Sequence, residues 1–318
     1  MNEMGNLDSL RNKTFMIAGA AGMLGKAFHE ALIEDVGDGK VIALSHQDLD
    51  ITDRNAVLSL EAEKPDFILH CAAQTNVDRC QEEPESCACV QIDGTLHVAE
   101  LAQRVGAKVF YPQSFLIFDG SDTPTTEATL PAPLSIYGNY KLEAERQLLL
   151  MLPDSLVVRM AGFFGGEEAD KNFVGKFARH LVKLIGDGVT SYEVGDRIWQ
   201  PTYTLDLARN CLHLLALGKT GTYNMAGHTE ASFFELAQAC VEYLGLSDRI
   251  TIVRVSAEIM AQRDRAARPK CVLLANQRLQ AEDLDLQRPW QVSLQDYLSR
   301  PYFHNLFQSL NPGAIDVA

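Results

Sequence analysis

The stretch that decides the fold is KTFMIAGAAGMLGKAFHEALI, residues 13–33. Its first six residues, 13–18, are mostly apolar and predict a short buried strand. The glycine-rich pattern GAAGMLG follows at 19–25, and residues 26–33 then have the apolar spacing of a helix. A strand, a glycine-rich turn and a helix in this order are typical of a dinucleotide-binding βαβ unit.

Each glycine of this turn has a physical role in such a unit. Gly19 allows the tight turn, Gly22 lets a pyrophosphate approach the backbone, and Gly25 lets the helix pack closely. The phosphate charge then lies at the helix N-terminus, where backbone N–H groups are free. Three glycines also fit an ordinary turn, but the flanking strand and helix favour a cofactor. The predicted cofactor loop comprises Gly19, Ala21, Gly22, Met23, Leu24 and Gly25.

Strands and helices continue to alternate through the first half of the chain. Short apolar runs predict strands at 41–44, 66–71, 108–111 and 156–159. Helical spacing appears at 53–63, 90–105 and 137–152. This alternation predicts an α/β protein with a Rossmann-type, doubly wound parallel sheet.

The rhythm changes after Gly162. Helices are expected at 172–184, 204–217 and 232–244, the second with Asp206 as a cap, and a strand at 250–255. We predict a Rossmann domain of 1–162 with a returning segment near 196–217. An interleaved, smaller substrate-binding domain of 163–300 and a loose tail of 301–318 complete the predicted organisation.

Composition excludes several classes of protein. The net charge of the 318 residues is −14, which argues against a nucleic-acid binder. No apolar run approaches the roughly 20 residues that span a bilayer, and the polar N-terminus does not resemble a signal peptide. The seven cysteines are therefore expected as free thiols in the cytoplasm. Their spacing does not fit a zinc site, so no metal is predicted.

In dinucleotide-binding folds, a side chain at the end of the second strand usually contacts the 2′ position of the adenosine ribose. Here it carries Ser45-His46-Gln47, without the acid that selects NAD at the tip. This favours NADP or dual use, although no arginine is present for the 2′-phosphate. Asp50 and Ile51 lie further on and are candidates to border the adenine, with a loop role as the alternative for Asp50.

Ser114, Tyr137 and Lys141 form the candidate catalytic set. Tyr137 and Lys141 are four residues apart, so they share one face of the predicted helix. An adjacent ammonium would lower the phenol pKa, which is ordinarily near 10. Tyr137 would then give a proton to a substrate carbonyl that Ser114 holds, while Lys141 binds the nicotinamide ribose. A Tyr-x-x-x-Lys pair alone usually lies on a surface helix, but the glycine loop favours catalysis.

With these residues in view, the chain resembles the extended short-chain dehydrogenases, and most closely the dTDP-4-dehydrorhamnose reductase family. The resemblance runs from about Lys13 to about Leu298. It is carried by AGAAGMLG (18–25), LDITD (49–53), PDFILHCAAQTNVDRCQEEP (65–84), FDG (118–120), SIYGNYKLEAE (135–145), QPT (200–202) and RP (268–269).

The resemblance implies NADPH- or NADH-dependent reduction of a 4-keto group on a nucleotide-linked deoxysugar. It implies that the cofactor is backed by Cys71, Ala72, Ala73 and Gln74, with Gln91 where the family usually has Asn. It also places Thr75, Val77, Gln200 and Arg268 beside the sugar nucleotide; for Arg268 an ordinary surface charge is the alternative. A homodimer is compatible with this interpretation.

Departures from the family concentrate on the sugar side. The family's Ser-Thr-Asp-Tyr-Val-Phe is QSFLIF at 113–118, which keeps the hydroxyl at Ser114 but loses the Asp-Tyr pair. A Trp that commonly lines the sugar pocket is replaced by Gly162. Trp199 replaces a family Gly, and we expect it either to refill that space and stack on a base or sugar, or to belong to the core.

Two alternative functions remain open. An epimerase or dehydratase of the same superfamily would use the same ligands, but a dehydratase needs an acid where Phe115 stands. A regulatory subunit similar to the methionine adenosyltransferase beta subunit would bind the cofactor without catalysis. The complete set of Ser114, Tyr137 and Lys141 weighs against this second alternative.

Overall fold

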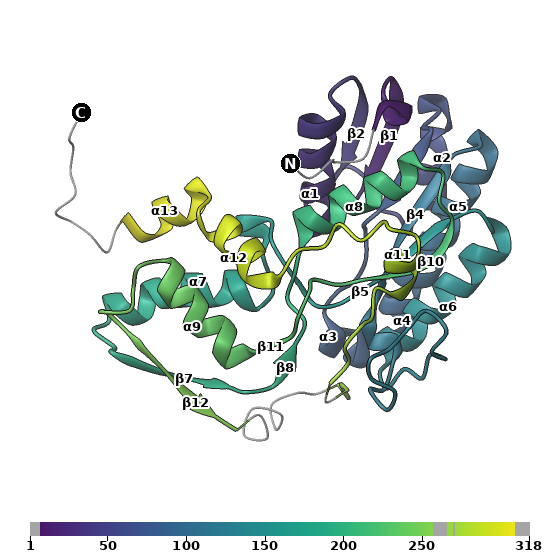
Figure 1. The fold of residues 1–318 in the computed structure, drawn as a ribbon. Coiled ribbons are helices and arrows are strands. Elements are labelled where there is room, and N and C mark those ends of the chain that lie inside the picture. Colours follow the sequence, from purple (N-terminus) through teal and green to yellow (C-terminus); the bar gives the residue numbers. More distant parts are fainter. Residues whose placement is uncertain (1–6, 257–265, 270, 309–318) are drawn as a thin grey trace, which may run out of the picture.

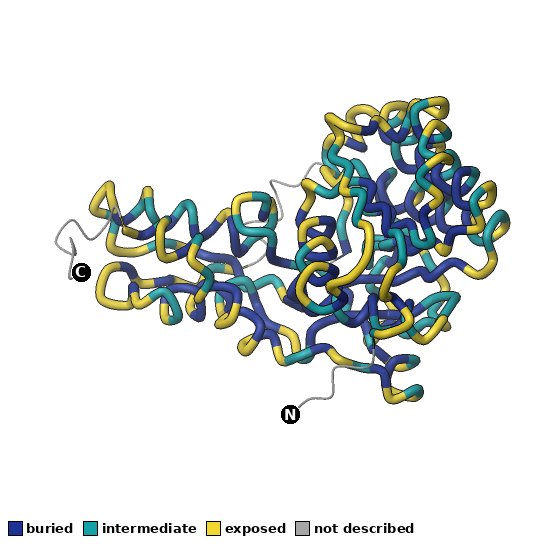
Figure 2. Tube along the Cα trace, turned by 90° about the horizontal axis from the view of Figure 1, so that it is seen from above, coloured by how far each residue is buried: buried dark blue, intermediate teal, exposed yellow. Residues whose placement is uncertain are grey.

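The computed structural model describes residues 7–256, 266–269 and 271–308. The chain forms two lobes joined side by side, a compact one built on a central sheet and an elongated one built mainly of helices (Figure 1). Buried residues fill the interior of both lobes (Figure 2). The largest buried cluster is continuous between the two lobes, since it contains Phe28 of the larger lobe and Leu181 of the smaller one.

The larger lobe contains a six-stranded sheet in the order β10-β5-β4-β3-β1-β2, in which every neighbouring pair is parallel. Its strands are β1 (Lys13–Ala18), β2 (Gly39–Leu44), β3 (Phe67–His70), β4 (Lys108–Ser114), β5 (Leu156–Met160) and β10 (Gly221–Met225). The chain starts at β1, adds β2 on one side of it, and then crosses to the other side to add β3, β4 and β5 in turn, so the strand order switches between β1 and β3. In open α/β sheets the ligand crevice lies at this switch point, outside the carboxyl ends of the strands.

Helices cover both faces of this sheet. On one face α1 (Met23–Ala31) packs against α8 (Thr204–Ala216); on the other, α5 (Gly94–Val105) packs against α2 (Arg54–Ser59) and α6 (Ile136–Met151). The alternation of side chains along β1 divides the core accordingly. Phe15 and Ile17 lie in the cluster with α1 and α8, whereas Met16 and Ala18 lie in the cluster with α5. The predicted doubly wound α/β fold is thus confirmed.

The smaller lobe is assembled from the later part of the chain. Its helices are α7 (Phe173–Gly186), α9 (Phe233–Tyr243), α12 (Trp290–Leu298) and α13 (Pro301–Gln308). Three short strand pairs accompany them: β7 (Ser191–Gly195) with β12 (Thr251–Val255), β8 (Ile198–Trp199) with β11 (Ala231–Ser232), and β6 (Phe163–Phe164) with β9 (Thr202–Tyr203). The short α11 (Gln277–Ala281) returns to β10 of the sheet.

The structure differs from the sequence-based expectations at four places. The stretch 186–199, for which the sequence predicts no helix or strand, contains β7 and β8, and β10 adds a sixth strand to the sheet. Asp206 is not a helix cap: its carboxylate accepts hydrogen bonds from Arg288 and Ser293. The predicted tail begins instead with α13, which buries Phe303 and Phe307, while 309–318 lie outside the described residues.

None of the helices in the described ranges has the length and apolar character needed to cross a bilayer.

Candidate active site

Tyr137 and Lys141 lie at the start of α6, and local sequence sets that start. Ser135 is the N-cap, and its hydroxyl accepts a hydrogen bond of 3.2 Å from the Gly138 N–H. A Cβ at position 138 would lie 2.4 Å from the Leu116 carbonyl oxygen. Gly138 therefore lets the first turn of α6 approach the segment after β4 closely.

Ser114 is the last residue of β4 and reaches the same place from the sheet. Its hydroxyl accepts a hydrogen bond of 3.2 Å from the Leu116 N–H and lies near enough to the Tyr137 phenol to lower the pKa of that phenol. Burial raises the pKa of Tyr137 to about 12, against the lowering effect of Ser114. The two hydroxyls that the sequence predicts to act together are therefore brought together.

Lys141 is only 3% exposed. Its ammonium donates a hydrogen bond of 2.7 Å to the Pro112 carbonyl and lies 3.9 Å from the centre of the Tyr111 ring. Burial lowers the pKa of Lys141 to about 7, while the nearby Glu145 carboxylate opposes that shift. Desolvation disfavours an ammonium, and the carbonyl and ring compensate it in part.

One expectation about this pair is wrong in the structure as it stands. The Lys141 ammonium was expected to lower the pKa of Tyr137, yet that pKa is raised, and Ser114 provides the lowering contribution. The physical reason is that Tyr137 is buried while the ammonium is bound to the Pro112 carbonyl.

A buried polar network lies behind these residues, and sequence patterns gave no signal for it. Gln113 on β4 and Arg159 on β5 are paired in register, and both donate to the Glu145 carboxylate on α6. The distances are 2.5 Å from Gln113 Nε2 and 2.9 Å from Arg159. Gln113 Nε2 also donates to the Lys141 carbonyl at 3.0 Å, and its Oε1 accepts from the Ser114 N–H at 2.8 Å.

The glycine loop has the shape that a dinucleotide needs. Gly19 has φ +87°, and a Cβ there would lie 2.6 Å from the Ala72 nitrogen. A Cβ on Gly25 would lie 2.3 Å from the Gly19 carbonyl oxygen, so Gly25 packs α1 onto the loop itself. Gly22 is exposed at the N-terminus of α1, where it carries no side chain. These features fit a pyrophosphate at this helix end.

The segment after β3 lies directly against this loop, because Ala72 is the residue that approaches Gly19. Buried Gln91 donates a hydrogen bond of 2.7 Å to the Gln74 carbonyl and so fixes the segment. Cys71 through Gln74 therefore line the switch point between β1 and β3, where the sequence places the cofactor.

At the end of β2 the structure adds an acid that sequence reasoning missed. The Asp48 carboxylate turns back and accepts hydrogen bonds from the Ser45 N–H at 2.9 Å and from its hydroxyl at 2.6 Å. A short-range turn of this kind is recognisable only once the loop conformation is known.

The other candidates for the adenosine end lie in the same loop. The Asp50 carboxylate accepts hydrogen bonds from the Thr52 N–H and hydroxyl, so it has the loop role that was the alternative to a cofactor contact. The Ile51 side chain is buried against α5. His46 makes no hydrogen bond within the described residues.

On the sugar side, Trp199 occupies the space above Gly162. A Cβ added to Gly162 would lie 1.7 Å from the indole Nε1, so only glycine fits there. The indole stacks on Phe233 with ring centres 5.3 Å apart, and Phe233 in turn contacts Phe173. Since Gly162 lies two residues beyond Met160, the register partner of Ser114, the indole lies at the same edge of the sheet as the Ser114 hydroxyl.

The remaining substrate candidates have partners within the protein. Gln200 is buried. Its amide oxygen accepts a hydrogen bond of 2.9 Å from the Leu274 N–H, and its amide nitrogen donates one of 3.0 Å to the Leu274 carbonyl. Arg268 forms a two-bonded ion pair with Asp78 on α3 (Val77–Glu82), at 2.9 and 3.0 Å. Thr75 is exposed, and Val77 packs beside Tyr137. Arg268 thus anchors the segment around it to the edge of the site.

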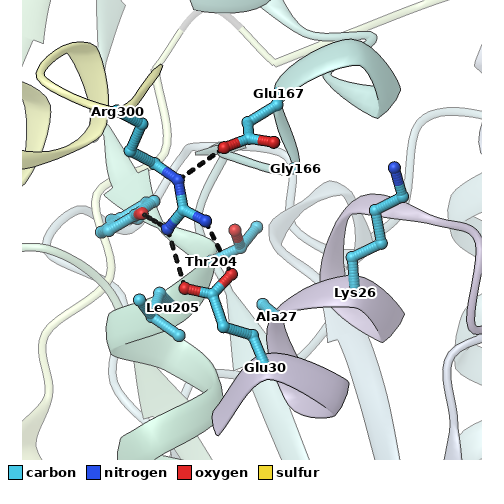
Figure 3. Close-up of a pocket in the computed structure, with 9 residues that line it drawn as sticks. Lys26, Ala27, Glu30, Gly166, Glu167, Thr204, Leu205 and Arg300 are labelled. Carbon is cyan, nitrogen blue, oxygen red and sulfur yellow. Dashed lines mark hydrogen bonds and ion pairs between the residues drawn. The ribbon is translucent and has the colours of Figure 1, made fainter. Parts of the chain in front are cut away.

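A small pocket where the lobes meet is closed by Arg300 (Figure 3). Its guanidinium donates to Glu30 on α1 at 2.8 and 2.9 Å, to Glu167 at 2.7 Å and to the Tyr203 phenol at 3.2 Å. Because Glu30 is on the helix that follows the glycine loop, this cluster ties the smaller lobe to the predicted cofactor helix. The described residues contain no group of three or more potential ligands arranged for a metal.

Comparison with known proteins now adds to this geometry. The family model described as "RmlD substrate binding domain" matches residues 13–302. The chain is 33% identical over 288 residues to a dTDP-4-dehydrorhamnose reductase of Streptomyces griseus, covering 88% of this chain and 91% of that one. It is also 26% identical over 307 residues to methionine adenosyltransferase 2 subunit beta of Pongo abelii, covering 91% and 88%.

Among solved structures, the chain is similar to a dTDP-4-dehydrorhamnose reductase of Bacillus anthracis in complex with NADP. The TM-score is 0.79 at 29% identity, and the match covers 90% of this chain and 98% of that one. The resemblance that the sequence motifs predict is therefore confirmed over nearly the whole chain.

Proposed function

The chain belongs to the RmlD substrate binding domain family, and we propose that it is an NADPH-dependent reductase of a 4-keto group on a nucleotide-linked deoxysugar. The observation that carries the proposal is the convergence of Ser114, Tyr137 and Lys141 on the ligand edge of the sheet, beside the glycine loop. Relatives with this activity align over most of the chain.

NADPH would be held by the glycine loop and by the segment after β3. The fit rests on Gly19 and Gly25, where any side chain would collide with backbone, and on the open N-terminus of α1. Ser45, His46, Asp50 and Ile51 would flank the adenosine, and Gln91 would hold the Gln74 backbone in place. When bound, the nicotinamide supplies the hydride for the reduction.

The chain's own residues supply the proton for the reduction and set the protonation state of its donor. Ser114 would donate a hydrogen bond to the substrate carbonyl oxygen, and Tyr137 would transfer its phenolic proton to that oxygen. Burial keeps Tyr137 protonated at neutral pH, since its pKa is raised to about 12. Lys141 would contact the nicotinamide ribose, and it would stabilise the phenolate only once its ammonium turns from the Pro112 carbonyl toward the phenol.

The nucleotide sugar would lie across Thr75, Val77, Gly162 and Trp199, with Arg268 toward the phosphates. Gln200 would act through the Leu274 backbone that it binds. The Rossmann and substrate-binding regions correspond in this proposal to the two lobes, with the returning segment extended to β10. A cytoplasmic homodimer is part of the proposal, and light scattering of the purified protein would test the assembly.

The direct test is turnover. Purified protein with NADPH and a panel of nucleoside-diphosphate 4-keto-6-deoxysugars is expected to oxidise the cofactor, with the alcohol as product. Absence of oxidation across several nucleotide bases would contradict the proposal. An epimerase or dehydratase would instead change the sugar without net loss of NADPH.

A second function is favoured by one specific observation, the similarity to methionine adenosyltransferase 2 subunit beta over 91% of the chain. A regulatory subunit would bind the cofactor and a partner protein without needing Tyr137. Co-purification of a stoichiometric partner, with function unchanged after Tyr137→Phe, would support this alternative over the reductase.

A further inference from the structure

Gln113 is the residue that connects the two elements carrying the candidate catalytic groups. It is 2% exposed and lies on β4 immediately before Ser114. Its Oε1 accepts the Ser114 N–H at 2.8 Å, while its Nε2 donates to the Lys141 carbonyl at 3.0 Å. One side chain therefore binds the backbone of Ser114 and the backbone of Lys141 at the same time.

The amide is held in a single orientation by its third partner. Nε2 also donates at 2.5 Å to Glu145, one helical turn beyond Lys141, and Arg159 holds the other carboxylate oxygen at 2.9 Å. Because Glu145 and the Lys141 carbonyl both accept, the nitrogen must face α6 and the oxygen must face Ser114. A flipped amide would leave buried groups without partners, which is costly.

We propose that Gln113 is a positioning residue for the reduction, which fixes the distance between the Ser114 hydroxyl and the Tyr137–Lys141 turn of α6. This inference rests on the proposed reductase function. Proton transfer requires the substrate oxygen to lie within hydrogen-bond reach of both hydroxyls, and a displacement of about 1 Å can cost two orders of magnitude in rate. Gln113 touches neither substrate nor cofactor and acts through the residues that it holds.

The test compares Gln113→Met with Gln287→Met in the full-length protein. Gln287 is a matched control because it is equally buried, at 4%, and its Nε2 donates to the Asp206 carbonyl and to Asn210, away from the site. We expect Gln113→Met to lower kcat about 10-fold or more while KM for NADPH and for the sugar nucleotide stays within about two-fold. Gln287→Met should keep the wild-type kcat. Equal kcat losses in both variants would overturn the proposal.

A double-variant cycle separates positioning from an independent effect. If Gln113 acts partly through Ser114, adding Gln113→Met to Ser114→Ala should cost much less than it costs in the wild-type background. If the fold-losses in kcat of the two single variants simply multiply in the double variant, the proposal is contradicted. Should Gln113→Met not fold, Gln113→Asn serves, because its shorter amide cannot span Ser114 and Lys141 together; an unchanged kcat in that variant would contradict the proposal.

A readout without turnover keeps this inference separate from the proposed function. Lysine ε-carbon NMR reports the titration of Lys141. This residue faces His70 at the end of β3, Cys71 just after it, Tyr111 on β4, and Glu145 on its own helix. We expect that titration to shift in Gln113→Met and not in Gln287→Met. An unchanged titration in both variants would overturn the inference, whereas an inactive wild type would instead contradict the reductase function.

Discussion

Two walls of the site are built in different ways. The proposed catalytic wall comprises Ser114, Tyr137 and Lys141, which come from the end of one strand and the first two turns of one helix. The sugar wall comprises Gly162, Trp199 and Phe233, which come from three separate segments and meet only through packing. The chemistry is thus determined by local spacing, whereas the shape of the substrate pocket depends on long-range contacts.

The largest effect is expected from breaking the catalytic wall alone. Tyr137→Phe removes the proton donor, so kcat should fall by about 10²–10⁴-fold while NADPH affinity persists. Tyr140→Phe is the control, because Tyr140 packs in the same cluster without reaching Ser114. Steady-state kinetics and cofactor binding measure both quantities. A Tyr137→Phe enzyme with near wild-type turnover would mean that the catalytic wall is assigned to the wrong residues.

A smaller effect is expected from changing the sugar wall, and it should appear in KM for the sugar nucleotide. In Gly162→Ala the new methyl would lie 1.7 Å from the Trp199 indole nitrogen, so the indole must move. We expect KM for the sugar nucleotide to rise about 10-fold or more, with NADPH affinity retained. Gly186→Ala is the matched control, since a Cβ there meets nothing within 4 Å. If both variants keep the same KM, the indole does not contribute to the substrate pocket.

The pH dependence sharpens the comparison on the catalytic side. Burial lowers the pKa of Lys141 to about 7, so the free enzyme loses this ammonium as pH rises through 7 rather than near the usual value for lysine. Since kcat/KM reports groups of the free enzyme, kcat/KM for NADPH should fall about 10-fold per pH unit above that point. A profile that stays flat to pH 9 would show that the amine is not required in its charged form.

The smallest effect is expected at the adenosine end, outside both walls. Asp48→Asn keeps a hydrogen-bond acceptor for Ser45 but removes a negative charge at the end of β2. KM for NADPH should fall about three-fold, and less at high salt, because the 2′-phosphate no longer meets that charge. Asp38→Asn, at the opposite end of β2, is the control. Equal effects on NADPH and NADH would place Asp48 away from the 2′ position.

The fold was predictable where local pattern and tertiary role agree. Residues 13–33 form β1, the glycine turn and α1 as their spacing indicates, and the helix expected from residue 53 begins there, with Asp53 as the N-cap of α2. Periodicity could not identify β10, whose five residues become a strand only through pairing with β5. The same holds for α13, which is stabilised by burying Phe303 and Phe307 against the smaller lobe.

The candidate site divides in the same way. Ser114, Tyr137 and the glycine loop follow from motif spacing, and in the structure Ser114 lies near enough to Tyr137 to lower its pKa. The orientation of Lys141 toward Pro112 depends on burial, which no spacing rule contains. Gln113 and Glu145 gave no signal because their function arises from pairing between β4, β5 and α6.

The central claim is that hydride moves from NADPH to the carbonyl carbon of a nucleotide-linked sugar. It is tested most directly with NADPH that carries deuterium at the transferred position of the nicotinamide, followed by mass spectrometry and NMR of the sugar product. We expect one deuterium per product molecule, at the carbon that was the ketone, and about 10²–10⁴-fold less deuterated product with Tyr137→Phe in the same time. A sugar that is changed without gaining deuterium, or that is not changed at all, would contradict it.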